Sequence, residues 1–101
     1  MRRQADKQEK KHMDRVASLG CVVCRNLGLG ASPSTVHHVR HGQGAGQRAG
    51  HFLTIPLCKL HHQDGGYGVA IHAGQEHWES LYGSELELLN KTIRDLEVRY
   101  G

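Results

Sequence analysis

Hydrophobic residues occur along this chain in short runs that are separated by long polar stretches. The mostly charged residues 4–18 become apolar only toward their end, for example at Met13 and Val16. This spacing predicts a helix whose buried face is limited to its last turns. Two later runs, 34–39 (S-T-V-H-H-V) and 52–57 (F-L-T-I-P-L), are short and rich in β-branched or apolar residues, and they predict two strands.

The C-terminal part of the chain has helical periodicity. Residues 74–82 carry apolar side chains on one side and predict one helix. Ser84 is the expected N-cap of a longer helix, because Glu87 three residues later completes a capping box. The apolar positions of that helix, which we expect to form its buried stripe, are Leu86, Leu89, Ile93, Leu96 and Val98.

Composition indicates that the core needs reinforcement. Only 38% of the 101 residues are hydrophobic, and the chain has one Trp, one Phe and three Tyr. A core this small is usually stabilised by disulfides or by a metal. Three cysteines cannot all pair within one chain, and no run resembles a signal peptide or a membrane span. We therefore expect a metal, a reducing cytoplasmic compartment and no membrane partner.

The spacing of the cysteines specifies this metal site. Cys21-x2-Cys24 and Cys58-x2-His61 have the ligand types and the two-residue gaps of a tetrahedral zinc knuckle. The fourth ligand is ambiguous between His61 and His62. We assign His61, because its gap from Cys58 repeats the gap between the first two cysteines.

The histidines left over from the knuckle are candidates for chemistry. His37 and His38 are neighbours on the expected strand, so they face opposite sides, and one can bind a metal while the other does something else. A neutral imidazole near pH 7 is a suitable general base. Taken alone, such a pair is more often an ordinary surface or packed pair. Its position between the two halves of the knuckle favours chemistry.

The charge is modest but unevenly distributed. The formal net charge is +3, and residues 37–51 contain Arg40 and Arg48 with no acid. A basic loop around histidines suits a polyanion. The N-terminal residues are also basic and include Lys10 and Lys11, although a solvated charged surface explains them equally well.

The order C-x2-C, strand ending in His, second strand, C-x2-H-H resembles the HNH (ββα-metal) endonucleases that carry a zinc knuckle, with His61 where a fourth cysteine is usual. The strings C-V-V-C, H-H-V-R-H-G-Q-G-A-G-Q-R-A, T-I-P-L-C-K-L-H-H and G-G-Y-G-V-A-I-H-A-G-Q are similar to the phage-encoded Ref family of recombination-enhancement, RecA-dependent nucleases. The similarity covers about residues 13–90. It implies a small α+β fold of the ββα-metal (HNH) type with a Cys3His zinc knuckle, flanked by an N-terminal helix and C-terminal helices. Residues 1–12 would be a basic segment that can fray, and 13–101 the nuclease domain.

The resemblance also implies roles for individual residues. His38 takes the position of the general base, and His37, His62 and His72 take those of the ligands of a catalytic ion. The residues expected to contact DNA phosphates are Arg40, Arg48, Lys10 and Lys11. The asparagine of the HNH name has no clear counterpart, and His51 or Thr54 is expected to brace the site instead.

These expectations describe a metal-dependent DNA endonuclease of recombination or repair that is encoded by a phage or prophage in a bacterial host. Its substrate would be RecA-coated DNA, single-stranded or in a displaced loop. The expected metals are a structural Zn²⁺ and a catalytic Mg²⁺, Mn²⁺ or Zn²⁺. The alternatives are a non-catalytic zinc-knuckle module that binds DNA or assists recombination, and a metal store or sensor. The four histidines outside the knuckle favour the enzyme.

Overall fold

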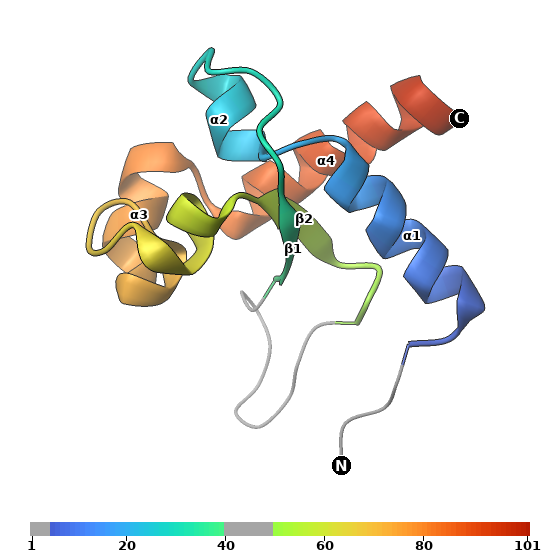
Figure 1. Cartoon of the computed structure of the whole chain (residues 1–101), viewed down its shortest axis with the longest axis horizontal. Helices are drawn as coiled ribbons and strands as arrows, with labels where there is room; N and C mark the ends of the chain where they lie inside the picture. Colours follow the sequence, from blue (N-terminus) through green and yellow to red (C-terminus); the bar gives the residue numbers. More distant parts are fainter. Residues whose placement is uncertain (1–4, 40–49) are drawn as a thin grey trace.

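The computed structural model describes residues 5–39 and 50–101 and shows a two-stranded antiparallel sheet surrounded by helices (Figure 1). The elements, in chain order, are α1 (Lys7–Ser18), α2 (Val22–Asn26), β1 (Thr35–His38), β2 (Thr54–Leu57), the π-helical turn η1 (Leu60–Asp64), the 3₁₀ turn η2 (Ile71–Ala73), α3 (Gln75–Tyr82) and α4 (Glu85–Tyr100). The α+β class predicted from the sequence is confirmed. Within these residues, no helix is both long enough and apolar enough to span a membrane.

Helix α1 begins at a complete capping box. The Asp6 carboxylate accepts a hydrogen bond from the Glu9 N–H at 2.8 Å, and the Glu9 carboxylate accepts one from the Asp6 N–H at 2.9 Å. Two orphan donors of the first turn are thereby satisfied. Residues 7–12, which the sequence assigns to the basic N-terminal segment, form the first half of this helix.

The sheet is small and its second strand is central. β1 pairs with β2 so that His37 lies opposite Ile55 and His38 opposite Thr54. All four residues of β2 are buried, because α1, α2 and α4 pack against this strand. The strand is shorter than predicted, since Phe52 precedes it and is exposed.

The core lies where the sheet meets α2, α3 and α4. Trp78 of α3 is fully buried, and its indole N–H donates to the Val69 carbonyl oxygen at 3.0 Å. The other buried members of this cluster are Cys21, Val22, Val23, Cys24, Val39, Ile55, Leu57, Ile71, Leu88 and Leu89. Both N-terminal cysteines therefore belong to the core itself.

Helix α4 begins as predicted, but its buried face matches the prediction only in part. The Ser84 hydroxyl accepts from the Glu87 N–H at 3.1 Å, which completes the expected capping box. The buried positions of the helix, however, are Glu85, Leu88, Leu89 and Thr92. Of the predicted stripe, Leu89 is buried and Leu96 is half-buried, whereas Leu86, Ile93 and Val98 are exposed. The apolar pattern was misleading because two polar residues occupy the buried face.

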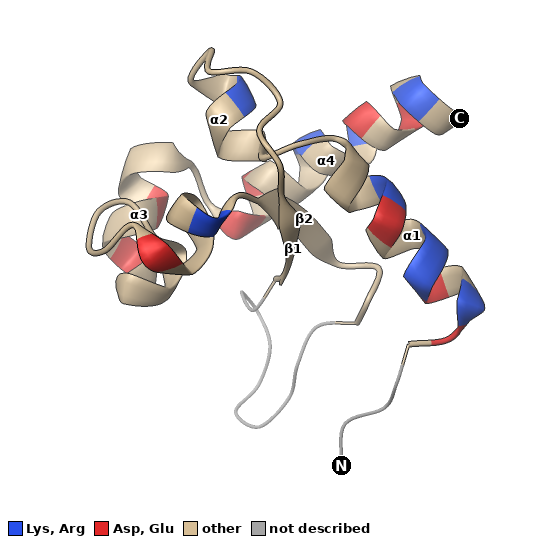
Figure 2. Ribbon diagram, in the orientation of Figure 1, with Lys and Arg blue, Asp and Glu red and all other residues tan. Residues whose placement is uncertain are grey.

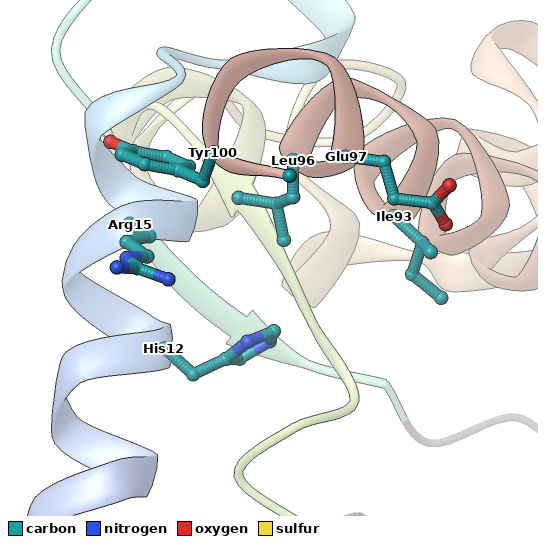
Figure 3. Close-up of a pocket in the computed structure, with 7 residues that line it drawn as sticks. His12, Arg15, Ile93, Leu96, Glu97 and Tyr100 are labelled. Carbon is teal, nitrogen blue, oxygen red and sulfur yellow. The ribbon is translucent and has the colours of Figure 1, made fainter.

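At its other end, α4 packs against α1 and leaves a groove of about 290 Å³. The groove is lined by His12, Arg15, Ile93, Leu96, Glu97, Tyr100 and Gly101 (Figure 3). The Arg15 guanidinium lies 4.7 Å from the centroid of the Tyr100 ring, a cation–π distance. Burial lowers the pKa of His12. The lining residue of α4 nearest to Glu85 is Ile93, eight positions later and about 12 Å further along the helix axis, so the groove is separate from Glu85.

Candidate functional site

The first two cysteines are presented by the short helix α2. Cys21 is the N-cap of α2, and its thiol accepts from the Cys24 N–H at 3.5 Å. Residues three apart at a helix start lie on the same side of it. The buried side chains of Val22 and Val23 anchor the helix in the core, so both thiols are held at fixed positions.

Four ligand atoms meet at this point with tetrahedral dimensions. The Cys24 and Cys58 sulfurs are 3.8 Å apart, and the His61 Nδ1 lies 3.7, 3.6 and 3.2 Å from the sulfurs of Cys21, Cys24 and Cys58. A tetrahedral Zn²⁺ with Zn–S of about 2.3 Å and Zn–N of about 2.0 Å would place sulfurs about 3.8 Å apart and sulfur and nitrogen about 3.5 Å apart. All three cysteines are free thiols. The Cys3His cluster fits a structural zinc ion.

The electrostatics of the Cys3His cluster also suit a cation. Burial raises the pKa of Cys21 to about 12; backbone hydrogen bonds from Cys24 and Cys58 act against this rise, and the neighbouring thiols add to it. Burial also tends to raise the pKa of Cys58, but hydrogen bonds from the His61 backbone and the other thiols bring it below its usual value. Burial lowers the pKa of His61, which favours the neutral imidazole that a metal requires. A divalent cation would stabilise thiolates that burial otherwise disfavours.

The π-helical turn η1 separates the two adjacent histidines. It closes through a hydrogen bond from the Gly65 N–H to the Leu60 carbonyl oxygen at 3.0 Å. A Cβ on Gly65 would lie 2.5 Å from that oxygen, so this closure requires glycine. His61 is buried on the side of the cysteines, whereas His62 is half-buried and belongs to a second cluster. Isolated π-helical turns are rare and often occur at functional sites.

The second cluster, which we call the three-histidine cluster, draws its members from three separate segments. His37 comes from β1, His62 from η1 and His72 from η2, and one nitrogen of each lies within 4.8 Å of the others. The Nε2 atoms of His62 and His72 are 2.9 Å apart. Neighbouring ligands at right angles around an ion at about 2.1 Å would be about 3.0 Å apart. The three-histidine cluster is therefore suited to a metal with open coordination positions.

The buried member of the three-histidine cluster has a carboxylate partner. His37 Nε2 lies 2.6 Å from an oxygen of Glu85, and both side chains are almost completely buried. Glu85 was not predicted from the sequence as a residue of the site. The missed signal is that Glu85 lies three and four residues before the buried Leu88 and Leu89, and thus on their face of α4.

His38, the predicted general base, has a different environment from His37. Its Nε2 lies 3.0 Å from Nδ1 of His51, and the two rings meet edge-on at 5.1 Å. The Thr54 hydroxyl donates to the His51 carbonyl oxygen at 3.4 Å. The two residues proposed from the sequence as braces therefore both lie beside His38: His51 contacts its ring, and Thr54 lies opposite it in the sheet.

Of the four residues expected to bind DNA, the structure describes only Lys10 and Lys11. Arg40 and Arg48 lie outside the described residues. Lys10 and Lys11 are exposed on α1, where Figure 2 shows that basic and acidic residues alternate along the ribbon of the helix. The described part of α1 is therefore not a purely basic surface.

Most of the chain, including both clusters, is related to known proteins. A family model described as "Recombination enhancement, RecA-dependent nuclease" matches residues 5–97, which also include Glu85. The chain belongs to this family. The chain is also similar to the uncharacterized protein YdfU of Escherichia coli (strain K12), with 31% identity over 87 residues. That alignment covers 84% of this chain and 22% of YdfU, so the chain spans about a fifth of the length of this relative.

Proposed function

We propose that this chain is a metal-dependent endonuclease of the HNH type that hydrolyses DNA phosphodiester bonds in recombination or repair. The observation that carries the proposal is the three-histidine cluster of His37, His62 and His72 beside a separate Cys3His cluster. A zinc module that only binds needs one cluster. The family description, which names a RecA-dependent nuclease, supports the same conclusion.

The arrangement of the elements supports an HNH assignment. β1, β2 and η1 follow one another in the chain, and the first strand and the helical turn each supply one residue to the three-histidine cluster. In a ββα-metal fold, two strands and a helix present the catalytic ion in this way. We assign η1 the place of that helix, shortened to a single π-helical turn.

The proposed chemistry begins with His38. If its Nε2 proton is donated to Nδ1 of His51, the lone pair of the ring lies on Nδ1, and that atom can take a proton from the attacking water. His37, His62 and His72 would hold a divalent cation, Mg²⁺, Mn²⁺ or Zn²⁺. Such a cation, when bound, supplies the positive charge that stabilises the pentacovalent phosphate and its leaving oxygen. The Cys3His cluster would hold a structural Zn²⁺ and take no part in the reaction.

The proposed substrate is DNA coated by RecA, either single-stranded or in a displaced loop. The part of the proposal that concerns RecA rests on the description of the family, which names a RecA-dependent nuclease. Arg40, Arg48, Lys10 and Lys11 are the proposed phosphate contacts, which predicts that affinity for DNA falls steeply as salt rises. We expect the protein to act in the cytoplasm of a bacterial host and to be encoded by a phage or prophage.

A nicking assay on RecA-coated DNA tests this function. We expect the wild-type protein to cleave and His38→Ala to lose about 10²–10⁴-fold in rate, the usual contribution of a general base. His77→Ala is the matched control, because His77 is exposed, stacks on Tyr67 and belongs to neither metal cluster. Equal cleavage by wild type and His38→Ala would refute the assignment of the base. DNA binding without cleavage by the wild type under any divalent ion would favour the accessory-module alternative.

A further inference from the structure

Glu85 is the buried acidic residue whose carboxylate contacts the three-histidine cluster. Its side chain is fully buried, and its Oε2 lies 2.6 Å from Nε2 of His37, itself 3% exposed. An ionised carboxylate only accepts hydrogen bonds, so we assign the shared proton to His37 Nε2. The lone pair of His37 is then on Nδ1.

The other two histidines present the opposite nitrogen. The Nε2 atoms of His62 and His72 are 2.9 Å apart, so these two rings approach each other through Nε2. His37 meets the same two rings edge-on, with centroids 5.1 Å from His62 and 5.3 Å from His72. A single ion bound by all three residues would therefore have a mixed set of ligand atoms.

We propose that Glu85 is a positioning residue that fixes His37 as an Nδ1 ligand of the catalytic ion, whereas His62 and His72 bind through Nε2. The inference rests on the proposed function insofar as it takes the three-histidine cluster as a metal site. A carboxylate behind a ligand histidine fixes the ring and its tautomer and makes the ligand more basic. The Glu85 carboxylate also places one negative charge near the ion. Three neutral imidazoles alone would not offset any of the charge of a divalent ion.

The fold holds this carboxylate by means of two helices. Glu85 is the first residue of α4, where the positive end of the helix stabilises an anion. Its own N–H donates to the carboxylate of Glu79 in α3 at 2.7 Å, which ties the end of α3 to the start of α4. The position of Glu85 against β1 thus depends on α3 and α4 together.

The test compares Glu85→Gln with Glu79→Gln. Glutamine at position 85 can still accept the hydrogen bond of His37 but carries no charge. Glu79→Gln is the matched control, because the glutamine oxygen can still accept from the Glu85 N–H, so the link between α3 and α4 is kept while a neighbouring negative charge is removed. Each protein is loaded with one equivalent of Zn²⁺ and then titrated with further Zn²⁺ by calorimetry. We expect Glu85→Gln to weaken the second binding event about 10–100-fold and to leave the first unchanged, with Glu79→Gln close to wild type.

A second measurement needs no variant. In ¹⁵N NMR of the wild-type histidine rings, filling the second site should shift Nδ1 of His37 but Nε2 of His62 and His72. Wild-type affinity of Glu85→Gln for the second ion, or a shift at Nε2 of His37, would overturn the proposal. A wild-type protein that binds no second ion overturns both this proposal and the proposed function. If the second ion binds as described but no DNA is cleaved, the role of Glu85 stands and the proposed function fails.

Discussion

The Cys3His cluster and the three-histidine cluster lie next to each other but differ in burial, ligand chemistry and origin in the chain. Cys21, Cys24 and His61 are buried, and Cys58 is partly exposed. In the three-histidine cluster, by contrast, His37 is buried but His62 is half-buried and His72 is exposed. Two of the cysteines are also part of the hydrophobic core, whereas the ring of His72 reaches solvent.

This difference indicates different tasks. Structural zinc sites are closed by four protein ligands, and catalytic sites keep a position open for substrate or water. Thiolates select Zn²⁺, whereas imidazoles accept several divalent ions. We therefore expect the ion of the Cys3His cluster, the first site, to contribute to folding, and the ion of the three-histidine cluster, the second site, to exchange readily. Three further predictions test this contrast.

The largest effect is expected from Cys24→Ser. Structural zinc in small domains contributes on the order of 10 kcal/mol, comparable to the total stability of about 5–15 kcal/mol of a typical domain. The variant should therefore lose most of its helical circular dichroism at room temperature. His72→Ala is the control, because its exposed ring can be removed without opening the core, and it should stay folded. A Cys24→Ser protein that melts like the wild type would remove the structural role of the Cys3His cluster.

A smaller and more selective effect is expected from replacing His61 or its neighbour His62 by alanine, one at a time. His61→Ala should lower the melting temperature strongly, whereas His62→Ala should leave it nearly unchanged and remove only the second ion. Thermal melts together with the metal content of the purified proteins measure both effects. The contrast between the clusters would break down if the two variants lost the same ion or the same stability.

The smallest effect concerns protons. An ordinary cysteine thiol is mostly protonated at pH 7.5, and burial raises the pKa of Cys21 further, to about 12, so this thiol must lose its proton when zinc binds. Filling the first site should therefore release protons, and its affinity should fall as the pH falls. The second site, built from imidazoles, should release far fewer at pH 7.5. Calorimetry in buffers of different ionisation enthalpy measures this release, and equal release from both sites would contradict the assignment.

Local patterns in the sequence were sufficient for part of this description. The two-residue gaps predicted that Cys21, Cys24, Cys58 and His61 form one metal site, and the structure places their ligand atoms within 4.8 Å of one another. The capping box at Ser84 was equally local and is confirmed. The α+β class and both strands followed from short apolar runs, although the strand ends shifted by one or two residues.

The features that were missed depend on contacts far apart in the chain. Glu85 meets His37 across 48 positions, and no periodicity relates the two. The same contact explains the error in α4, where the buried face includes Glu85 and also Thr92, whose hydroxyl donates to the Leu88 carbonyl oxygen at 2.8 Å. The spacing of apolar residues cannot identify the buried face of a helix when that face also carries polar side chains that are hydrogen-bonded in the folded protein. The role of Gly65, which allows the π-helical turn, was likewise not predicted.

The π-helical turn has a consequence for how the two ions influence each other. Because His61 and His62 are consecutive residues of η1, any ion that fixes one ring also restricts the backbone that carries the other. Such a link is a coupling free energy, and it must be equal in both directions. Zinc among the cysteines should raise the affinity of the histidines for their ion, and the second ion should strengthen the binding of zinc to the same thermodynamic extent. The protein would then fill its two sites cooperatively, although the two sites share no ligand.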